Sequence, residues 1–148
     1  MKNCKSGIGS VVPLSLCILA FCISANAQTP KVVTAAQANG LYRYYRNEFR
    51  ILALGHNKLE VQFNGEWMTR GGYPNIGEAR GEATIEGNVA TFVPGDTTEC
   101  KITIKFLRNR LEVTQEGFDA ACGFGHNVMA TGTYRKVRGG KPKFITNP

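Results

Sequence analysis

The feature that most constrains this chain is an alternation of apolar and polar residues with a period of two, recurring between residues 41 and 136. In the segment 101–107, Ile102, Ile104 and Phe106 alternate with polar residues, and Leu111 and Val113 do so in the segment that follows. Such alternation is typical of strands with one buried face and one face toward solvent. No segment has an apolar stripe of helical period long enough to compete, so the pattern predicts an all-β fold.

β-Branched and aromatic residues are concentrated in eight short segments, as expected for pleated, half-buried surfaces. Turn residues separate many of them, including GHNK at 55–58, EGN at 86–88 and RNR at 108–110. The predicted strands are 41–46, 49–54, 59–63, 79–85, 89–93, 101–107, 111–115 and 128–136. Eight strands joined by hairpins can close on themselves and fill their interior with side chains. We therefore predict an eight-stranded antiparallel up-and-down barrel over 40–138, with a two-sheet sandwich as the alternative.

Residues 1–27 have the three parts of a secretory signal peptide. Lys2 and Lys5 precede an apolar run over 11–23, and Ala25 and Ala27 take the small-residue positions before an expected cleavage site at Ala27. The run is too short for a comfortable membrane span, so no stable span is expected after cleavage. We therefore expect a periplasmic or secreted protein. A flexible arm is predicted over 28–39 and a basic flexible tail over 139–148.

Cleavage at this site would leave Cys100 and Cys122 as the only cysteines. Two cysteines in an oxidising compartment pair by default. Cys100 precedes the strand 101–107 and Cys122 follows the strand 111–115, so the hairpin between these strands brings both cysteines to one end of the barrel. The sequence therefore predicts a structural disulfide that anchors the following loop, in which Phe124 would cap the core.

The sequence ACGFGHN at 121–127 places Cys122 near His126, a pairing that a cysteine nucleophile would require. An oxidised Cys122 offers no thiolate, which excludes that chemistry. All serines precede residue 28, and there is no G-x-S-x-G motif. His56 and His126 are predicted at opposite ends of the barrel, and no Cys-x-x-Cys or His-x-His spacing indicates a metal site. We predict that the protein is not an enzyme and holds no metal or cofactor.

A glycine-rich connector over 66–78 is the first candidate binding site, and we predict it to be a loop. Exposed aromatic and arginine side chains are good anchors for a partner, although such side chains can also simply cover the mouth of a barrel. The candidate residues are Trp67, Met68, Arg70 and Tyr73.

A basic patch is the second candidate, because the first and last strands of a closed barrel are neighbours. Its predicted residues are Arg43, Arg46, Arg135, Lys136 and Arg138. With a formal net charge of +7, the chain is suited to an anionic envelope component or an acidic protein. Export disfavours nucleic acid as the partner. The alternative is a solvated charged surface with no ligand.

The segment TTECKITIKFLRNRLEVTQEGFDAACGFGHNVMATGTYRK, at 97–136, resembles a module of small exported bacterial proteins. Its pattern is C-x-I-x-[IL]-x-F, then L-x-V-x-Q-x-G, then C-G-F-G-x-x-V-x-A-x-G-x-Y, matched here from Cys100 to Tyr134. Such modules accompany lysozyme-inhibitor proteins, and the eight-strand plan is similar to the barrel of periplasmic c-type lysozyme inhibitors. The resemblance implies a barrel, a disulfide and a lysozyme-inhibitor-like function. The chain lacks the S-G-x-x-Y type of loop, so no inhibitory residue is carried over.

Together these features predict an exported, non-enzymatic envelope binding protein of the lysozyme-inhibitor type, whose partner is a protein or an anionic envelope component. The alternative function is a small-ligand carrier that uses the barrel interior. Small residues in the predicted strands would leave room for such a ligand, or would lie where the wall is crowded. They are Ala83, Ala90, Ala130 and Gly132.

Overall fold

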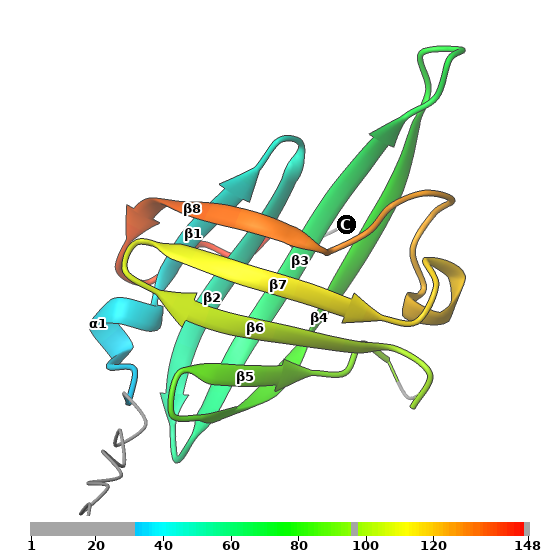
Figure 1. The fold of residues 1–148 in the computed structure, drawn as a ribbon. Helices are drawn as coiled ribbons and strands as arrows, with labels where there is room; N and C mark the ends of the chain where they lie inside the picture. Colours follow the sequence, from blue (N-terminus) through cyan, green and yellow to red (C-terminus); the bar gives the residue numbers. More distant parts are fainter. Residues whose placement is uncertain (1–31, 96–97, 147–148) are drawn as a thin grey trace, which may run out of the picture.

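The computed structural model describes residues 32–95 and 98–146, in which eight antiparallel strands form a closed barrel (Figure 1). Each strand pairs with its neighbours in the chain, and the last strand pairs with the first. The strands are β1 (Gly40–Tyr44), β2 (Asn47–Gly55), β3 (Lys58–Met68), β4 (Pro74–Glu86), β5 (Val89–Phe92), β6 (Lys101–Leu107), β7 (Arg110–Glu116) and β8 (Gly132–Gly139). The predicted up-and-down barrel is confirmed, and the sandwich alternative is wrong. The predicted signal peptide, with its cleavage site at Ala27, lies outside the described residues.

Inward-facing aromatic and branched side chains fill the barrel. The rings of Phe49 and Phe63 lie 5.0 Å apart, and those of Phe49 and Tyr134 lie 4.9 Å apart, between centroids. The Tyr134 hydroxyl donates a hydrogen bond to the Ala130 carbonyl at 2.8 Å. Burial raises the pKa of the Tyr134 phenol, so this hydroxyl stays a neutral donor. The largest fully buried side chains are Tyr42, Tyr134, Phe49, Phe63, Phe92, Ile51, Leu59, Ile102, Ile104, Leu111, Val61 and Val128.

The strands β3 and β4 are longer than predicted. They continue as a paired ribbon, the β3–β4 extension (residues 65–77), which projects beyond the barrel in Figure 1. The register Trp67↔Asn75 shows that most of the expected glycine-rich loop is strand, with only a short turn at 69–73. The prediction of a loop over 66–78 was therefore wrong. Alternation could not reveal the outer part of these strands, because residues 66–68 and 74–76 are exposed or half-buried on both faces of the ribbon.

The strand β8 begins at Gly132 rather than at residue 128. Backbone pairing between β7 and β8 ends at Val113↔Gly132. Beyond this pair, side chains take the place of backbone partners in the hydrogen bonds between the two segments. The Gln115 side-chain carbonyl accepts a hydrogen bond from the Ala130 N–H at 2.8 Å, and the Thr131 hydroxyl accepts one from the Gln115 N–H at 2.9 Å. The residues before β8 are thereby held against the barrel without strand geometry.

Residues on both sides of the barrel strands, in the segments predicted as arm and tail, make contacts with the barrel. Thr34 and Gln37 form a capping box at the start of helix α1 (Ala35–Ala38), and Ala38 is buried. On the outer face, the Gln62 amide donates to the Ile145 carbonyl at 2.7 Å and accepts from the Ile145 N–H at 2.8 Å. These bonds explain why Gln62, an outward-facing polar residue, is buried.

The predicted disulfide between Cys100 and Cys122 is confirmed, with the two Cα atoms 5.0 Å apart. Cys122 belongs to the 3-10 turn η1 (Ala120–Cys122), in the loop between β7 and β8. Within this loop Phe124 is buried, and its ring lies 4.9 Å from that of Phe63, between centroids. The disulfide and Phe124 together fasten the loop over one end of the core, as predicted.

Candidate functional site

A groove of about 530 Å³ opens beside the β3–β4 extension. Three parts of the chain form it: the β1–β2 turn, the outer end of β3 and the residues before β8. Figure 1 shows all three at the same end of the barrel. The lining residues are Tyr44, Tyr45, Arg46, Asn47, Glu66, Trp67, Met68, Asn127, Val128, Met129 and Thr131. Trp67 and Met68, both predicted binding residues, lie in this groove.

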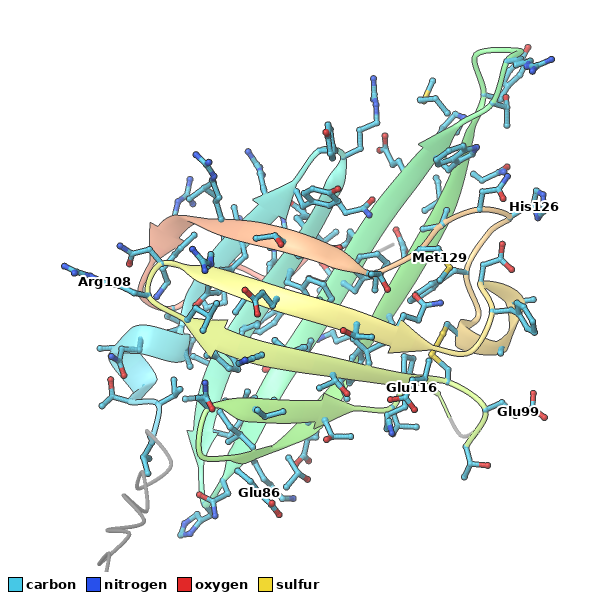
Figure 2. The ribbon with its side chains drawn as sticks, in the orientation of Figure 1. Glu86, Glu99, Arg108, Glu116, His126 and Met129 are labelled. Atoms are coloured by element: carbon cyan, nitrogen blue, oxygen red, sulfur yellow. A yellow bond between two sulfur atoms is a disulfide. The ribbon has the colours of Figure 1, made fainter. Side chains whose placement is uncertain are left out.

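Large apolar side chains are exposed together along the groove. Tyr45 is 89% exposed and Trp67 is 50% exposed, and the side chains of Met68 and Met129 are exposed beside them. Met129 is labelled in Figure 2, in the segment that leads into β8. A cluster of exposed apolar side chains of this kind is characteristic of a surface that a partner covers.

Tyr45 has an unusual backbone conformation at the tip of the β1–β2 turn. Its φ angle is 50°, in the left-handed region that bulky residues rarely adopt and that costs roughly 1–3 kcal/mol. Its ring packs edge-on against Tyr44, with centroids 4.6 Å apart. Tyr44 in turn packs over Gly132, where an added Cβ would lie 2.5 Å from the Tyr44 ring. The turn therefore holds an aromatic ring out toward solvent at an energetic cost, which favours a functional role.

Asn47 joins the three walls of the groove. Its side-chain N–H donates to the Met129 carbonyl at 2.9 Å, and its side-chain oxygen accepts from the Glu66 N–H at 3.2 Å. Arg46 lies 3.5 Å from the Glu66 carboxylate and adds a second link between the β1–β2 turn and β3. The groove is therefore organised without a ligand, which reduces the entropy that binding would cost.

Asp119 organises the loop that forms the third wall. Its carboxylate accepts hydrogen bonds from the N–H groups of Asn127 at 2.5 Å and Ala120 at 2.7 Å. These backbone donors, together with a smaller contribution from His126 at 3.6 Å, hold the pKa of the Asp119 carboxyl below its ordinary value. The loop is also tied to the extension, because the Asn75 side chain donates to the His126 carbonyl at 2.7 Å.

We expect the order of this loop to depend on pH through Asp119. Because its pKa is lower in the folded state, the ionised carboxylate stabilises the loop fully above the unfolded pKa, about pH 4. That stabilisation is lost as the pH falls through the folded pKa. Hydrogen-exchange protection factors at the Asn127 amide should therefore decrease in acid.

At neutral pH, the Asp119→Ala variant should show the same loss of protection at Asn127. Glu86→Ala, which removes an exposed acid at the β4–β5 turn, is the matched control and should leave this amide unchanged. Equal protection at Asn127 in Asp119→Ala and in the parent protein would contradict this role for the carboxylate.

The other predicted loop residues lie outside the groove lining. Arg70 and Tyr73 belong to the turn at the tip of the extension, and Tyr73 is 79% exposed. His56 lies in the β2–β3 turn, and His126 lies in the loop before β8, where Figure 2 labels it. Among the residues that the structure describes, no three His, Cys, Asp or Glu side chains form a group that could hold a metal ion. No helix in these same ranges has the length and hydropathy needed to cross a membrane.

No protein-family model, curated protein or solved structure matches this chain. The resemblance to lysozyme-inhibitor modules therefore stays a prediction.

The structure keeps three of the five residues of the predicted basic patch near one another on β1 and β8 and places the other two elsewhere. Arg43 and Arg135 are directly opposite each other across β1 and β8, and Arg138 lies opposite Leu41. Arg46 belongs to the groove instead.

The ammonium of Lys136 is bound by helix α1. It donates to the Gln37 carbonyl at 2.7 Å and to the Ala36 carbonyl at 3.3 Å, both in this helix. It also lies 5.3 Å from the centre of the Tyr42 ring. Partial burial lowers the pKa of Lys136. Lys136 therefore joins helix α1 to the barrel, which is a structural role.

Sequence reasoning missed the groove itself and most of its lining, including Asn47 and Met129. The available signal was the sequence YYRN at 44–47, in which Tyr45 and Arg46 occupy the two turn positions that ordinarily hold asparagine and glycine in a hairpin. Tyr45 at such a position is not explained by burial in the core, because its side chain is exposed.

Proposed function

We propose that this protein is an exported, non-enzymatic binding protein of the cell envelope, which docks a partner protein in the groove beside the β3–β4 extension. The observation that carries the proposal is the set of exposed side chains of Tyr45, Trp67, Met68 and Met129 on a frame braced by Asn47. Tyrosine, tryptophan and methionine are enriched in the cores of protein interfaces. The only charged groups of the lining, Arg46 and Glu66, are paired with each other.

One wall of the groove also offers a strand edge that no other strand of the described residues pairs with. Pairing between β2 and β3 ends at Glu48↔Asn64, so residues 66–68 of β3 have no strand partner on the groove side. The Glu66 N–H points to this side, because it donates to Asn47, and the backbone groups of Met68 follow the same direction two residues later. An extended segment of the partner would add to this edge while its apolar side chains contact Trp67 and Tyr45.

The chemistry of the chain supports binding rather than catalysis. Cys122 is oxidised and offers no nucleophile beside His126. The interior is occupied by the core side chains, including the aromatic cluster around Phe49, which disfavours the small-ligand carrier. A lysozyme is the partner class that the sequence resemblance implies. Because a lysozyme carries a net positive charge, it would have to contact acidic side chains of this chain rather than its arginines.

We expect Trp67→Ala to weaken partner binding by at least about tenfold, because buried tryptophans carry much of the energy of protein interfaces. Tyr73→Ala is the matched control: it removes an exposed aromatic ring from the same extension, outside the groove, and should change the affinity less than about twofold. The assay is quantitative affinity capture from envelope extract with each variant, followed by direct titration of the captured protein. Purified lysozymes of several classes are titrated in parallel.

A protein captured equally by the parent chain and by Trp67→Ala would contradict the assignment of the groove. If no class of lysozyme binds in these titrations, the lysozyme hypothesis is wrong. A partner whose binding is lost in Trp67→Ala and kept in Tyr73→Ala would still support the groove as the docking site.

A further inference from the structure

Three arginines lie side by side on the outer face of the barrel where it closes. Arg135 on β8 is in register with Arg43 on β1 and with Arg110 on β7. All three side chains are exposed, while the adjacent Tyr134 faces the core. Directly opposite residues of antiparallel strands have Cβ atoms about 5 Å apart, and like charges at this spacing repel each other. The row therefore depends on nearby negative charges for its stability.

Carboxylates neutralise the two ends of this row but not its centre. Glu48 lies 3.2 Å from Arg43, and Glu112 lies 3.7 Å from Arg110. Among the described residues, 32–95 and 98–146, no carboxylate forms an ion pair with Arg135. The central guanidinium is thus flanked by two cations and has no anion of its own.

A shallow depression adjoins Arg135 and Arg110, at the β6–β7 turn. Arg108 lies in this turn, and Figure 2 labels it at the edge of the barrel. The Lys136 N–H donates to the Asn109 carbonyl at 2.9 Å, which fixes the turn against β8. Thr133, on the exposed face of β8, supplies a neutral hydroxyl. The depression is lined by Arg108, Asn109, Arg110, Glu112, Thr133, Arg135 and Lys136.

We propose that this surface, the arginine seam (Arg108, Arg110 and Arg135), binds a phosphate-bearing anion such as a phosphomonoester or a diphosphate. The planar guanidinium donates paired hydrogen bonds that match the spacing of phosphate oxygens. An anion with two or more negative charges would replace the repulsion around Arg135 with attraction. The seam shares no lining residue with the groove, so this site is independent of the proposed protein docking.

The test is calorimetric titration of the purified protein with inorganic diphosphate, at low salt where screening is weak. Arg135→Gln should lower the affinity by about tenfold or more, the loss expected for a charge-assisted contact. Arg135→Lys, which keeps the charge but loses the paired donors, should bind with intermediate affinity. Arg70→Gln is the matched control, because it removes an exposed arginine from the tip of the extension. It should change the affinity by less than about twofold, since only general attraction is lost.

Thermal unfolding separates this role from a structural one. Without ligand, Arg135→Gln should keep or raise the unfolding temperature, because it removes like-charge repulsion. Diphosphate should raise the unfolding temperature of the parent protein by more than that of Arg135→Gln at the same concentration. Equal loss of affinity in Arg135→Gln and Arg70→Gln, or no binding of diphosphate by the parent protein, would overturn the proposal.

Vesicle flotation then identifies the source of the phosphate. Vesicles containing phosphatidic acid present a phosphomonoester headgroup, and phosphatidylcholine vesicles are the zwitterionic control. Arg135-dependent binding to the phosphatidic acid vesicles would support a lipid headgroup as the ligand. Binding of free diphosphate alone would support a soluble phosphorylated ligand.

Discussion

Replacing both Cys100 and Cys122 with alanine is expected to lower the free energy of unfolding by about 3 kcal/mol, since a cross-link over a loop of this size restricts the unfolded chain by that amount. The two residues are 22 positions apart in the sequence, and both are buried in the native state. Urea denaturation of the oxidised parent protein and the double variant measures the difference.

Reductant provides the control for this prediction. It should lower the denaturation midpoint of the parent protein toward that of the double variant, and it should leave the double variant unchanged. The same substitutions release the loop that carries Met129, so affinity at the groove should fall as well. Equal denaturation midpoints for the oxidised parent protein and the double variant would contradict a stabilising disulfide.

Phe63→Ala is expected to lower the free energy of unfolding by about 3–5 kcal/mol, the range for removing a buried phenylalanine. Phe63 is fully buried, and its ring contacts Phe49 on β2 and Phe124 in the loop between β7 and β8. A cavity at this point lies between two strands and the loop that covers them, so it cannot collapse by moving a single side chain.

Phe124→Ala is the comparison for this substitution. It removes the same side chain from a loop that has more freedom to relax, so its effect should be smaller. Urea denaturation of both variants measures the two changes, with Tyr73→Ala as an exposed control near zero. If Phe124→Ala lowers the free energy of unfolding as much as Phe63→Ala or more, the expectation that the loop relaxes around the cavity is wrong.

The strands that could be predicted well are those with one buried and one exposed face. In β6, Ile102, Ile104 and Phe106 are buried and lie between exposed or half-buried residues, so the alternation of the sequence is the alternation of the structure. The extension does not follow this rule, because Trp67 and Ile76 are both exposed on a ribbon without a core beneath it. Gln62 breaks the rule in the opposite direction, since the C-terminal residues cover it.

The candidate site could be predicted only in part, because it joins segments that are distant in the sequence. Trp67 and Met68 were recognisable as large side chains in a region rich in glycine. The contact between Asn47 and Met129 spans 82 positions, and only the closure of the barrel brings them together. The exposure of Tyr45 depends on a φ angle that composition and periodicity do not specify.

Pairing between β1 and β8 also has a consequence for folding kinetics. These contacts join residues separated by nearly the whole barrel chain, so they raise the contact order and we expect closure of the barrel to be a slow step of folding. Until β8 pairs with β1, one edge of β1 has no partner and can pair with another molecule instead. The closing pair of strands is therefore where a newly made chain is most exposed to aggregation.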